Sequence, residues 1–196
     1  VPAIIASVVL AIPIARLARV ARPLRAVLVT GSSLLYAVPS LALFVILPII
    51  LATGIRDPLN VIVALTLYGL ALLVPATADA LDAVDARVLD AATAMGMGRL
   101  RCFLTVELPL AGPAILTGLR VVTVSTISLT TVGAVLGVRS LGWLFTDGFQ
   151  RGVTAEILTG LVSTAALALI LDGLVLALGR LCLPWTWKRV GTSGAA

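Results

Sequence analysis

Few residues in this chain could carry out chemistry on a substrate. The 196 residues include no histidine, and the single lysine, Lys188, lies between Trp187 and Arg189. Histidine-based zinc sites and Ser/His/Asp triads are therefore excluded, as is a phosphate-binding loop that needs lysine followed by serine or threonine. Cys102 and Cys182 lie far apart with no CxxC pattern, so we expect two free thiols. The chain is predicted not to be an enzyme and to hold no cofactor or metal of its own.

Two charged residues border or interrupt apolar stretches. Asp172 directly follows the charge-free run 157–171, and Arg120 directly precedes the run 121–138. An ionisable group within a membrane is a candidate functional residue. Asp172 supports an alternative function as a proton-coupled secondary transporter, and it could equally cap a helix or pair near the inner interface. Arg120 could line a path through the membrane, or it could extend its long side chain to the lipid headgroups.

The composition indicates a membrane protein. Hydrophobic residues make up 60% of the chain and charged residues 12%, against about 45–50% and about 25% in an average soluble domain. The net charge of +5 comes from basic residues clustered between apolar runs, which is typical of membrane loops and argues against a nucleic-acid partner. We predict an all-α protein embedded in the lipid bilayer, with residues 1–196 forming a single transmembrane domain and further residues preceding Val1.

Charge-free stretches mark the predicted spans. A hydrocarbon core of about 30 Å needs about 20 apolar residues per helix. Five helices fit this pattern, the first of them short: residues 1–17, 27–53, 59–78, 112–138 and 155–179.

Basic residues are distributed unequally between the two sides of these helices. Ten would lie on one side: Arg16, Arg19, Arg22, Arg25, Arg87, Arg99, Arg101, Arg180, Lys188 and Arg189. Three would lie on the other: Arg56, Arg139 and Arg151. Because cytoplasmic loops carry the excess of positive charge, the side with ten is predicted to be cytoplasmic. The N-terminus would then lie outside and the C-terminus inside.

The segment 80–109 differs in kind from the spans. Charged side chains stand among its alanines, so we expect helices outside the bilayer that break at Gly96. Ala91 and Ala92 would offer little side-chain bulk to an approaching protein surface, and Gly96 can adopt the left-handed conformation that ends a helix. Pro109 would restart the chain in the first turn of the next span.

The spacing within this segment resembles a known motif. Asp90 and two alanines are followed by Gly96 and, nine residues later, by the residues 106–109. This pattern resembles the EAA loop of ABC importer permeases, with Asp90 in place of glutamate and Val106 in place of isoleucine. The resemblance implies a type I importer (MetI-like) permease core of about five transmembrane helices with a cytoplasmic coupling helix. It assigns coupling to an ATPase to seven residues: Asp90, Ala91, Ala92, Gly96, Val106, Leu108 and Pro109.

Other segments resemble one subfamily, the permeases of osmoprotectant importers for glycine betaine, carnitine, choline and proline betaine. These segments are residues 38–43, 67–68, 94–97, 106–110 and 118–120, whereas residues 75–76 and 137–142 depart from the subfamily pattern. The resemblance implies a complex in the bacterial inner membrane with a cytoplasmic ABC ATPase dimer, which carries ATP and magnesium. It also implies a second permease subunit, identical or similar, and an extracytoplasmic solute-binding protein.

Hydroxyl and aromatic side chains within the spans are candidates for a low-affinity solute path, although each can also be explained by packing. A quaternary ammonium group is usually surrounded by several aromatic rings, and the spans hold few. High-affinity recognition is therefore expected on the binding protein. The candidate path residues are Tyr36, Ser40, Tyr68, Arg120, Thr126, Thr130 and Thr131.

Overall fold

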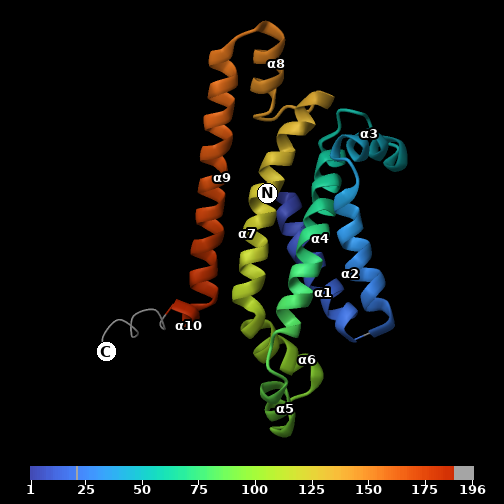
Figure 1. Cartoon of the computed structure of the whole chain (residues 1–196), viewed down its shortest axis with the longest axis vertical. Helices are drawn as coiled ribbons and strands as arrows, with labels where there is room; N and C mark the ends of the chain where they lie inside the picture. The colour runs from blue at the N-terminus through green and yellow to red at the C-terminus, as the bar shows by residue number, and fades with distance from the viewer. Residues whose placement is uncertain (21, 188–196) are drawn as a thin grey trace.

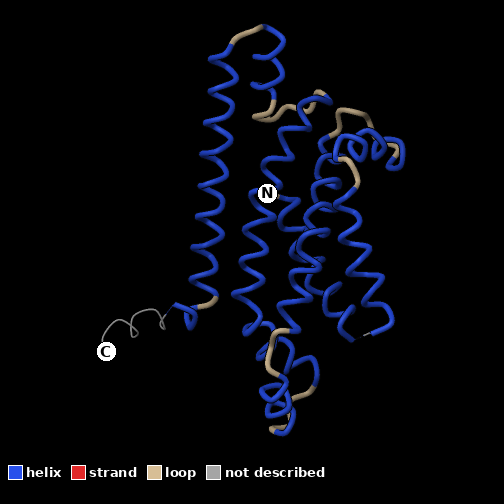
Figure 2. The backbone as a smooth tube through the Cα atoms, viewed as in Figure 1, coloured by secondary structure: helices blue, strands red, loops and turns tan. Residues whose placement is uncertain are grey.

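The computed structural model describes residues 1–20 and 22–187, and every regular element in these ranges is a helix (Figure 2). Lys188 and Arg189, which contribute to the predicted charge asymmetry, lie outside the described residues. Four helical stretches are long and apolar enough to cross a membrane: α1 (Pro2–Val20), α4 (Pro58–Asp82), the run containing α7 (Leu108–Val132), and α9 (Thr154–Cys182). The bent pair of α2 (Arg22–Ala37) and α3 (Ser40–Leu51) can supply a fifth span. The prediction of an all-α protein with about five spans is confirmed.

Helix α4 lies at the centre of the bundle and packs against α1, α2 and α7 (Figure 1). Helix α9 runs beside α7, and α8 (Trp143–Arg151) folds back against α9 at one end. Helix α3 lies across that same end of the bundle. The short helices α5 (Ala86–Ala94) and α6 (Arg99–Cys102) extend beyond the opposite end. The segment singled out in the sequence is therefore the part of the chain that projects from the bundle.

Small side chains allow α1 to lie close to α4. The buried residues of α1 recur at nearly every fourth position: Ala3, Ser7, Ala11, Ala15 and Ala18. Residues spaced by four share one face of a helix, and small residues on that face let two backbones approach. At Gly69 of α4 a Cβ atom would collide with the Ser7 side chain. The four-residue spacing of these small side chains is visible in the sequence.

The single helix predicted over residues 27–53 is wrong. The chain bends by 107° between Arg25–Ala37 and Ser40–Leu51. Pro39 lies at the bend, where it has no amide proton and disfavours helical conformation in the preceding residue, Val38. The Tyr68 hydroxyl of α4 donates a hydrogen bond to the Val38 carbonyl oxygen, which supplies a partner for this backbone group at the bend.

The other predicted spans agree with the structure more closely. Residues 1–17, 59–78 and 155–179 correspond to α1, α4 and α9. The helix predicted over 112–138 is continuous only to Val132 and tightens into the 3-10 turn η2 (Gly133–Leu136). Gly137 then ends the run with a φ of +80°, a conformation that costs glycine little. Helix α8 was not predicted.

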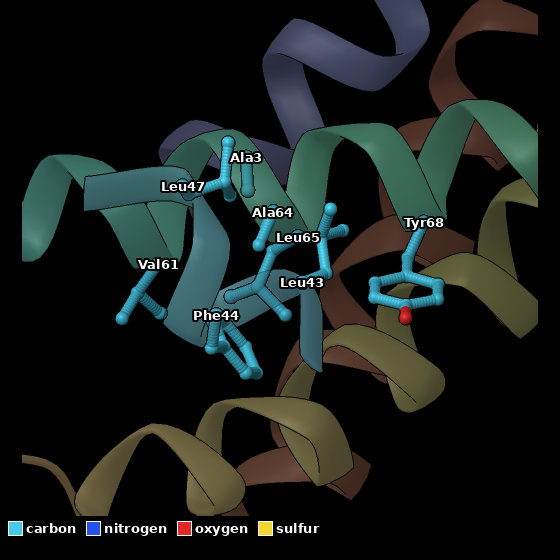
Figure 3. Close-up of a cluster of buried hydrophobic side chains, with 8 residues drawn as sticks. All are labelled: Ala3, Leu43, Phe44, Leu47, Val61, Ala64, Leu65 and Tyr68. Carbon is cyan, nitrogen blue, oxygen red and sulfur yellow. The ribbon is translucent and has the colours of Figure 1, made fainter. Parts of the chain in front are cut away.

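Two buried clusters join the bundle at its ends. Figure 3 shows the one that attaches α3 to α1 and α4: Ala3, Leu43, Phe44, Leu47, Val61, Ala64, Leu65 and Tyr68. The other includes Ala15 of α1, Leu81 of α4 and Phe103, which follows α6. Because Phe103 belongs to this second cluster, the projecting segment is attached to the bundle at its base.

Candidate functional site

The projecting segment between α4 and α7 begins with a well-capped helix. The Asp85 carboxylate accepts a hydrogen bond of 2.9 Å from the Arg87 amide at the N-terminus of α5. At the C-terminus, Gly96 has a φ of +82°. The Met97 amide donates to the Ala92 carbonyl oxygen and the Gly96 amide to that of Thr93. These paired bonds form a Schellman motif, so the predicted left-handed turn at Gly96 is confirmed.

This segment exposes apolar side chains beside its charged ones. The side chains of Met95, Leu100 and Val88 are 72%, 59% and 41% exposed. Exposed apolar groups that gather on a projecting segment commonly mark a protein-binding surface. Ala92, which the sequence suggested for the outer surface, is only 2% exposed. It faces inward because α5 packs against α6 and the segment that follows, whereas Asp90, Ala91 and Gly96 are exposed.

The chain returns to the bundle through an irregular turn of helix. Residues Phe103–Glu107 form the π-helical segment η1, which ends where the Leu108 amide donates to the Phe103 carbonyl oxygen. Pro109 is the second residue of α7 and so lies in the first turn of that helix, as predicted, although α7 follows η1 without a break in the helical run Arg99–Leu136. A proline inside a helix cannot donate to the carbonyl four residues earlier, and the wider π turn directly before Pro109 accommodates this loss. Val106, Leu108 and Pro109 are half-buried there.

The predicted path residues fall into two groups. Thr126, Thr130 and Thr131 of α7 border a cavity of about 330 Å³, together with Thr164 and Leu171 of α9. The Thr130 and Thr131 hydroxyls donate to the backbone of their own helix, at 2.6 Å in both cases. The cavity therefore offers a mainly apolar lining with a few hydroxyl groups, and the buried hydroxyl of Thr164 has no hydrogen-bond partner among the described residues.

The second group lies at the bend between α2 and α3. The rings of Tyr36 and Tyr68 meet edge to face, with centroids 6.1 Å apart and planes at 86°. Ser40 begins α3 at the same bend. Tyr68 is 4% exposed and Tyr36 50% exposed. Because Tyr68 hydrogen-bonds the Val38 carbonyl, its evident role in this structure is to hold the bend.

Arg120 and Asp172 pair with each other. The guanidinium of Arg120 donates through Nε and Nη2 to the two carboxylate oxygens of Asp172, at 2.8 and 2.7 Å. This bidentate geometry is the strongest form of a side-chain ion pair. It joins α7 to α9, and it leaves Asp172 ion-paired rather than available as an isolated proton carrier. Nothing in the sequence pairs these two residues, which lie 52 positions apart along the chain.

The two cysteines lie in different surroundings. Cys102 is buried and Cys182 is exposed, and both are free thiols as predicted. The described ranges contain no group of three or more histidine, cysteine, aspartate or glutamate side chains able to hold a metal ion.

Comparison with known proteins identifies the kind of protein in which these features occur. Residues 3–183 match the family described as "Binding-protein-dependent transport system inner membrane component". The chain belongs to this family. Members are membrane components of transport systems, and the predicted membership of a binding-protein-dependent transport family is confirmed.

Named relatives of this inner membrane component share about a third of its residues. It is 32% identical over 161 residues to the choline transport system permease protein OpuBD of Bacillus subtilis (strain 168), covering 82% of this chain and 70% of the relative. It is also 32% identical over 151 residues to an ergothioneine transport permease/ergothioneine binding protein, EgtU, of Helicobacter pylori (strain G27). That match covers 77% of this chain but only 27% of the relative's length.

A solved structure shows the same fold. The inward-facing MetNI methionine ABC transporter superposes with a TM-score of 0.79, over 92% of this chain and 89% of the matched chain. The sequence identity is 20%, so the likeness concerns the fold alone. The prediction of a MetI-like permease core is confirmed.

Proposed function

We propose that this inner membrane component is the permease subunit of an ATP-driven, binding-protein-dependent importer, and that its projecting segment docks on a cytoplasmic ABC ATPase dimer. The observation that carries the proposal is the exposed apolar surface of Met95, Leu100 and Val88 on a segment whose charges keep it out of lipid. ATP and magnesium would be bound by the ATPase, because this chain has no phosphate-binding loop.

The positions of these residues suggest that different parts of the segment have different roles. Asp90, Ala91 and Gly96 are exposed at or beside the turn of α5 and would meet the ATPase directly. Val106, Leu108 and Pro109 lie at the return to the bundle and would carry movement into α7. Ala92 would act from inside, since its small buried side chain lets α5 pack against the following helical segment.

The charge distribution sets the proposed orientation. The end of the bundle that carries α5 and α6 would face the cytoplasm, with the N-terminus outside, since basic residues concentrate on the cytoplasmic side. The opposite end, with α3 and α8, would face the extracytoplasmic binding protein. A second permease subunit, identical or similar, would complete the pore.

We propose osmoprotectants with a quaternary ammonium group as the solute class: glycine betaine, choline, carnitine and proline betaine. Support comes from the relative named for choline. Ergothioneine, for which the other relative is named, also carries a trimethylammonium group. Low-affinity passage past the hydroxyls of Thr126, Thr130 and Thr131 fits a small solute whose tight recognition lies on another protein. Tyr36, Ser40, Tyr68 and Arg120 remain candidates whose observed contacts are structural.

A reconstituted complex tests the solute class. The permease would be assembled in proteoliposomes with its ATPase and binding protein, and ATP-dependent uptake of each radiolabelled solute would be measured, with ergothioneine and methionine as further arms. We expect uptake of at least one of the four osmoprotectants, independent of an imposed proton gradient. Uptake of ergothioneine or methionine alone would contradict the osmoprotectant class, and uptake driven by the proton gradient without ATP would contradict the importer itself.

A matched pair of substitutions tests the docking surface. Met95→Asp places a charge in the exposed apolar surface, whereas Phe149→Asp makes the same kind of change at an 80% exposed side chain on α8, at the other end of the bundle. We expect Met95→Asp to lose co-purification with the ATPase and Phe149→Asp to retain it. Full ATPase binding by Met95→Asp would remove this surface from the docking site.

A further inference from the structure

One arginine contacts both ends of the projecting segment. Arg19, in the last turn of α1, donates through Nη1 to the Leu81 carbonyl oxygen at 2.8 Å. The same nitrogen donates to the Glu107 carboxylate, and Nε lies 3.5 Å from the Asp82 carboxylate. Leu81 and Asp82 end α4, where the segment leaves the bundle, and Glu107 ends η1, where it returns. The guanidinium therefore bridges the two ends of the segment at its base.

Neighbouring arginines reinforce this position. Arg25 of α2 forms a second ion pair with Asp82. Arg16, which lies one helical turn before Arg19 on α1, places its guanidinium carbon 4.1 Å from the centroid of the Phe103 ring. Phe103 is the first residue of η1 and Glu107 the last. Both ends of the π-helical segment are therefore held by α1.

The Arg19 contacts are partly buried, so they should be stronger than those of an ion pair on the surface. The Glu107 side chain is 14% exposed and that of Arg19 29% exposed. Partly desolvated charges interact more strongly than exposed ones, and removal of one partner leaves the other poorly solvated. The fork of an arginine can reach three acceptors at once, which the single ammonium of lysine cannot do.

The local helix geometry explains why such a contact matters. A π turn interrupts the regular hydrogen-bond ladder, and such turns are places where helices bend. Without a fixed distance between Asp82 and Glu107, a force applied to α5 could be absorbed by bending at η1. With that distance fixed, the force must be passed to α1 and α4, which pack along each other.

We propose that Arg19 is a positioning residue that closes the base of segment 83–107 and transmits movement of α5 to α1 and α4. This inference rests on the proposed function, because it concerns how ATPase movement reaches the membrane helices. Loosening the base would leave ATPase docking intact while separating ATP hydrolysis from solute movement.

The first experiment needs the permease alone and is independent of the proposed function. A spin label would be placed at Met95→Cys in a Cys182→Ser background, since Cys102 is buried, and its mobility measured by electron paramagnetic resonance. We expect greater mobility in Arg19→Gln and in Glu107→Gln. Arg87→Gln is the matched control, because the Arg87 side chain is 94% exposed and lies 3.9 Å from Asp85 within the same segment.

A double variant separates the ion pair from general damage. In Arg19→Met/Glu107→Met both charges are replaced by apolar groups, so no unpaired charge remains, and we expect mobility closer to wild type than in either single variant. Unchanged mobility in both single variants would overturn the proposal. Mobility in the double variant as high as in Arg19→Gln would also overturn it, because no coupling between the two residues would then exist.

The second experiment measures coupling in the reconstituted complex as ATP hydrolysed per solute transported. We expect this ratio to rise at least about fivefold in Arg19→Gln and Glu107→Gln, the lower end of typical coupling between sites, with ATPase co-purification retained. Arg139→Gln, an exposed arginine beyond the other end of α7, should leave it unchanged. An unchanged ratio in both variants overturns the role of Arg19. If the wild-type complex transports nothing, the proposed function fails, while the spin label still decides whether Arg19 closes the base.

Discussion

Helices α4 and α9 are similarly apolar but are packed in opposite ways. In the most apolar stretch of α4, 56% of the residues are buried within the chain, whereas in α9 the share is 0%. Helix α4 is surrounded by α1, α2 and α7, while α9 lies at the edge of the bundle beside α7 and α8 (Figure 1). Hydropathy therefore indicates that a helix crosses the bilayer, but it does not indicate what the helix packs against.

The difference follows from where close contacts occur. Helix α4 approaches α1 along a stripe of small residues, so that Gly69 lies directly against Ser7. Helix α9 approaches α7 at separate points, including Gly179 against Leu116 and the pair of Asp172 with Arg120. In a membrane, lipid is as apolar as leucine, so association depends on close packing and polar contacts rather than on burial alone. Substitutions in the two helices should therefore have unequal effects.

The largest difference in unfolding free energy between variants of α4 and variants of α9 is expected when a leucine is replaced by alanine. Leu73 of α4 is fully buried, and Leu169 of α9 is 74% exposed. Leu73→Ala should lower the unfolding free energy by about 2–5 kcal/mol because it leaves a cavity, and Leu169→Ala should change it by less than about 0.5 kcal/mol. Unfolding of the detergent-solubilised chain in increasing dodecyl sulfate measures both. Equal losses would mean that α9 is packed as tightly as α4.

Substituting a glycine in each helix should give a somewhat smaller difference in unfolding free energy between α4 and α9. Gly69→Ala forces a Cβ atom into the Ser7 side chain, with Val122 also within 3.3 Å, and should destabilise the chain by about 1–3 kcal/mol. Gly173→Ala in α9 meets nothing within 4 Å and should gain up to about 1 kcal/mol from helix propensity. The same unfolding assay distinguishes the two. A stabilised Gly69→Ala would show that α1 and α4 are not in close contact.

Removing one member of the Arg120–Asp172 ion pair should weaken the contact of α9 with α7 and leave the rest of the bundle unchanged. Asp172→Asn leaves the Arg120 guanidinium without its carboxylate partner, and in the same unfolding assay the unfolding free energy should fall by less than for Gly69→Ala. The double variant Arg120→Gln/Asp172→Asn should recover part of this loss, because neither charge is then unpaired. Disulfide formation between cysteines introduced on α7 and α9 would report their separation. A double variant no more stable than Asp172→Asn would argue against direct pairing of Arg120 with Asp172.

The smallest effect is expected where α9 meets a flexible side chain. At Gly179 an added Cβ would contact the end of the Leu116 side chain, which can move aside. Gly179→Ala should thus lose little by collision and gain about 1 kcal/mol or less in helix propensity, for a net change near zero in the unfolding assay. A loss comparable to that of Gly69→Ala would show that α7 and α9 are rigidly packed at this point.

Local features of the projecting segment were accessible from the sequence. The glycine turn at Gly96 depends on neighbours along the chain, and it is present in the structure. The inward orientation of Ala92 was not accessible, since it depends on α5 folding back on α6 and η1. The two prolines Pro39 and Pro109 have different surroundings, because Pro39 lies at the bend between α2 and α3, whereas Pro109 lies in the first turn of α7 directly after the π-helical segment.

The sequence by itself determined that this chain is an all-α membrane protein and that it carries a loop pattern resembling that of importer permeases. These conclusions depend on composition and on spacings shorter than about 20 residues. Only the tertiary structure decided that Arg19 meets Glu107, that Arg120 meets Asp172, and that α4 rather than α9 forms the core. Residues 52 or 88 apart along the chain come into contact only through the relative positions of whole helices. Those positions depend on close contacts between small residues of neighbouring helices, and the hydropathy of the sequence does not indicate where these contacts occur.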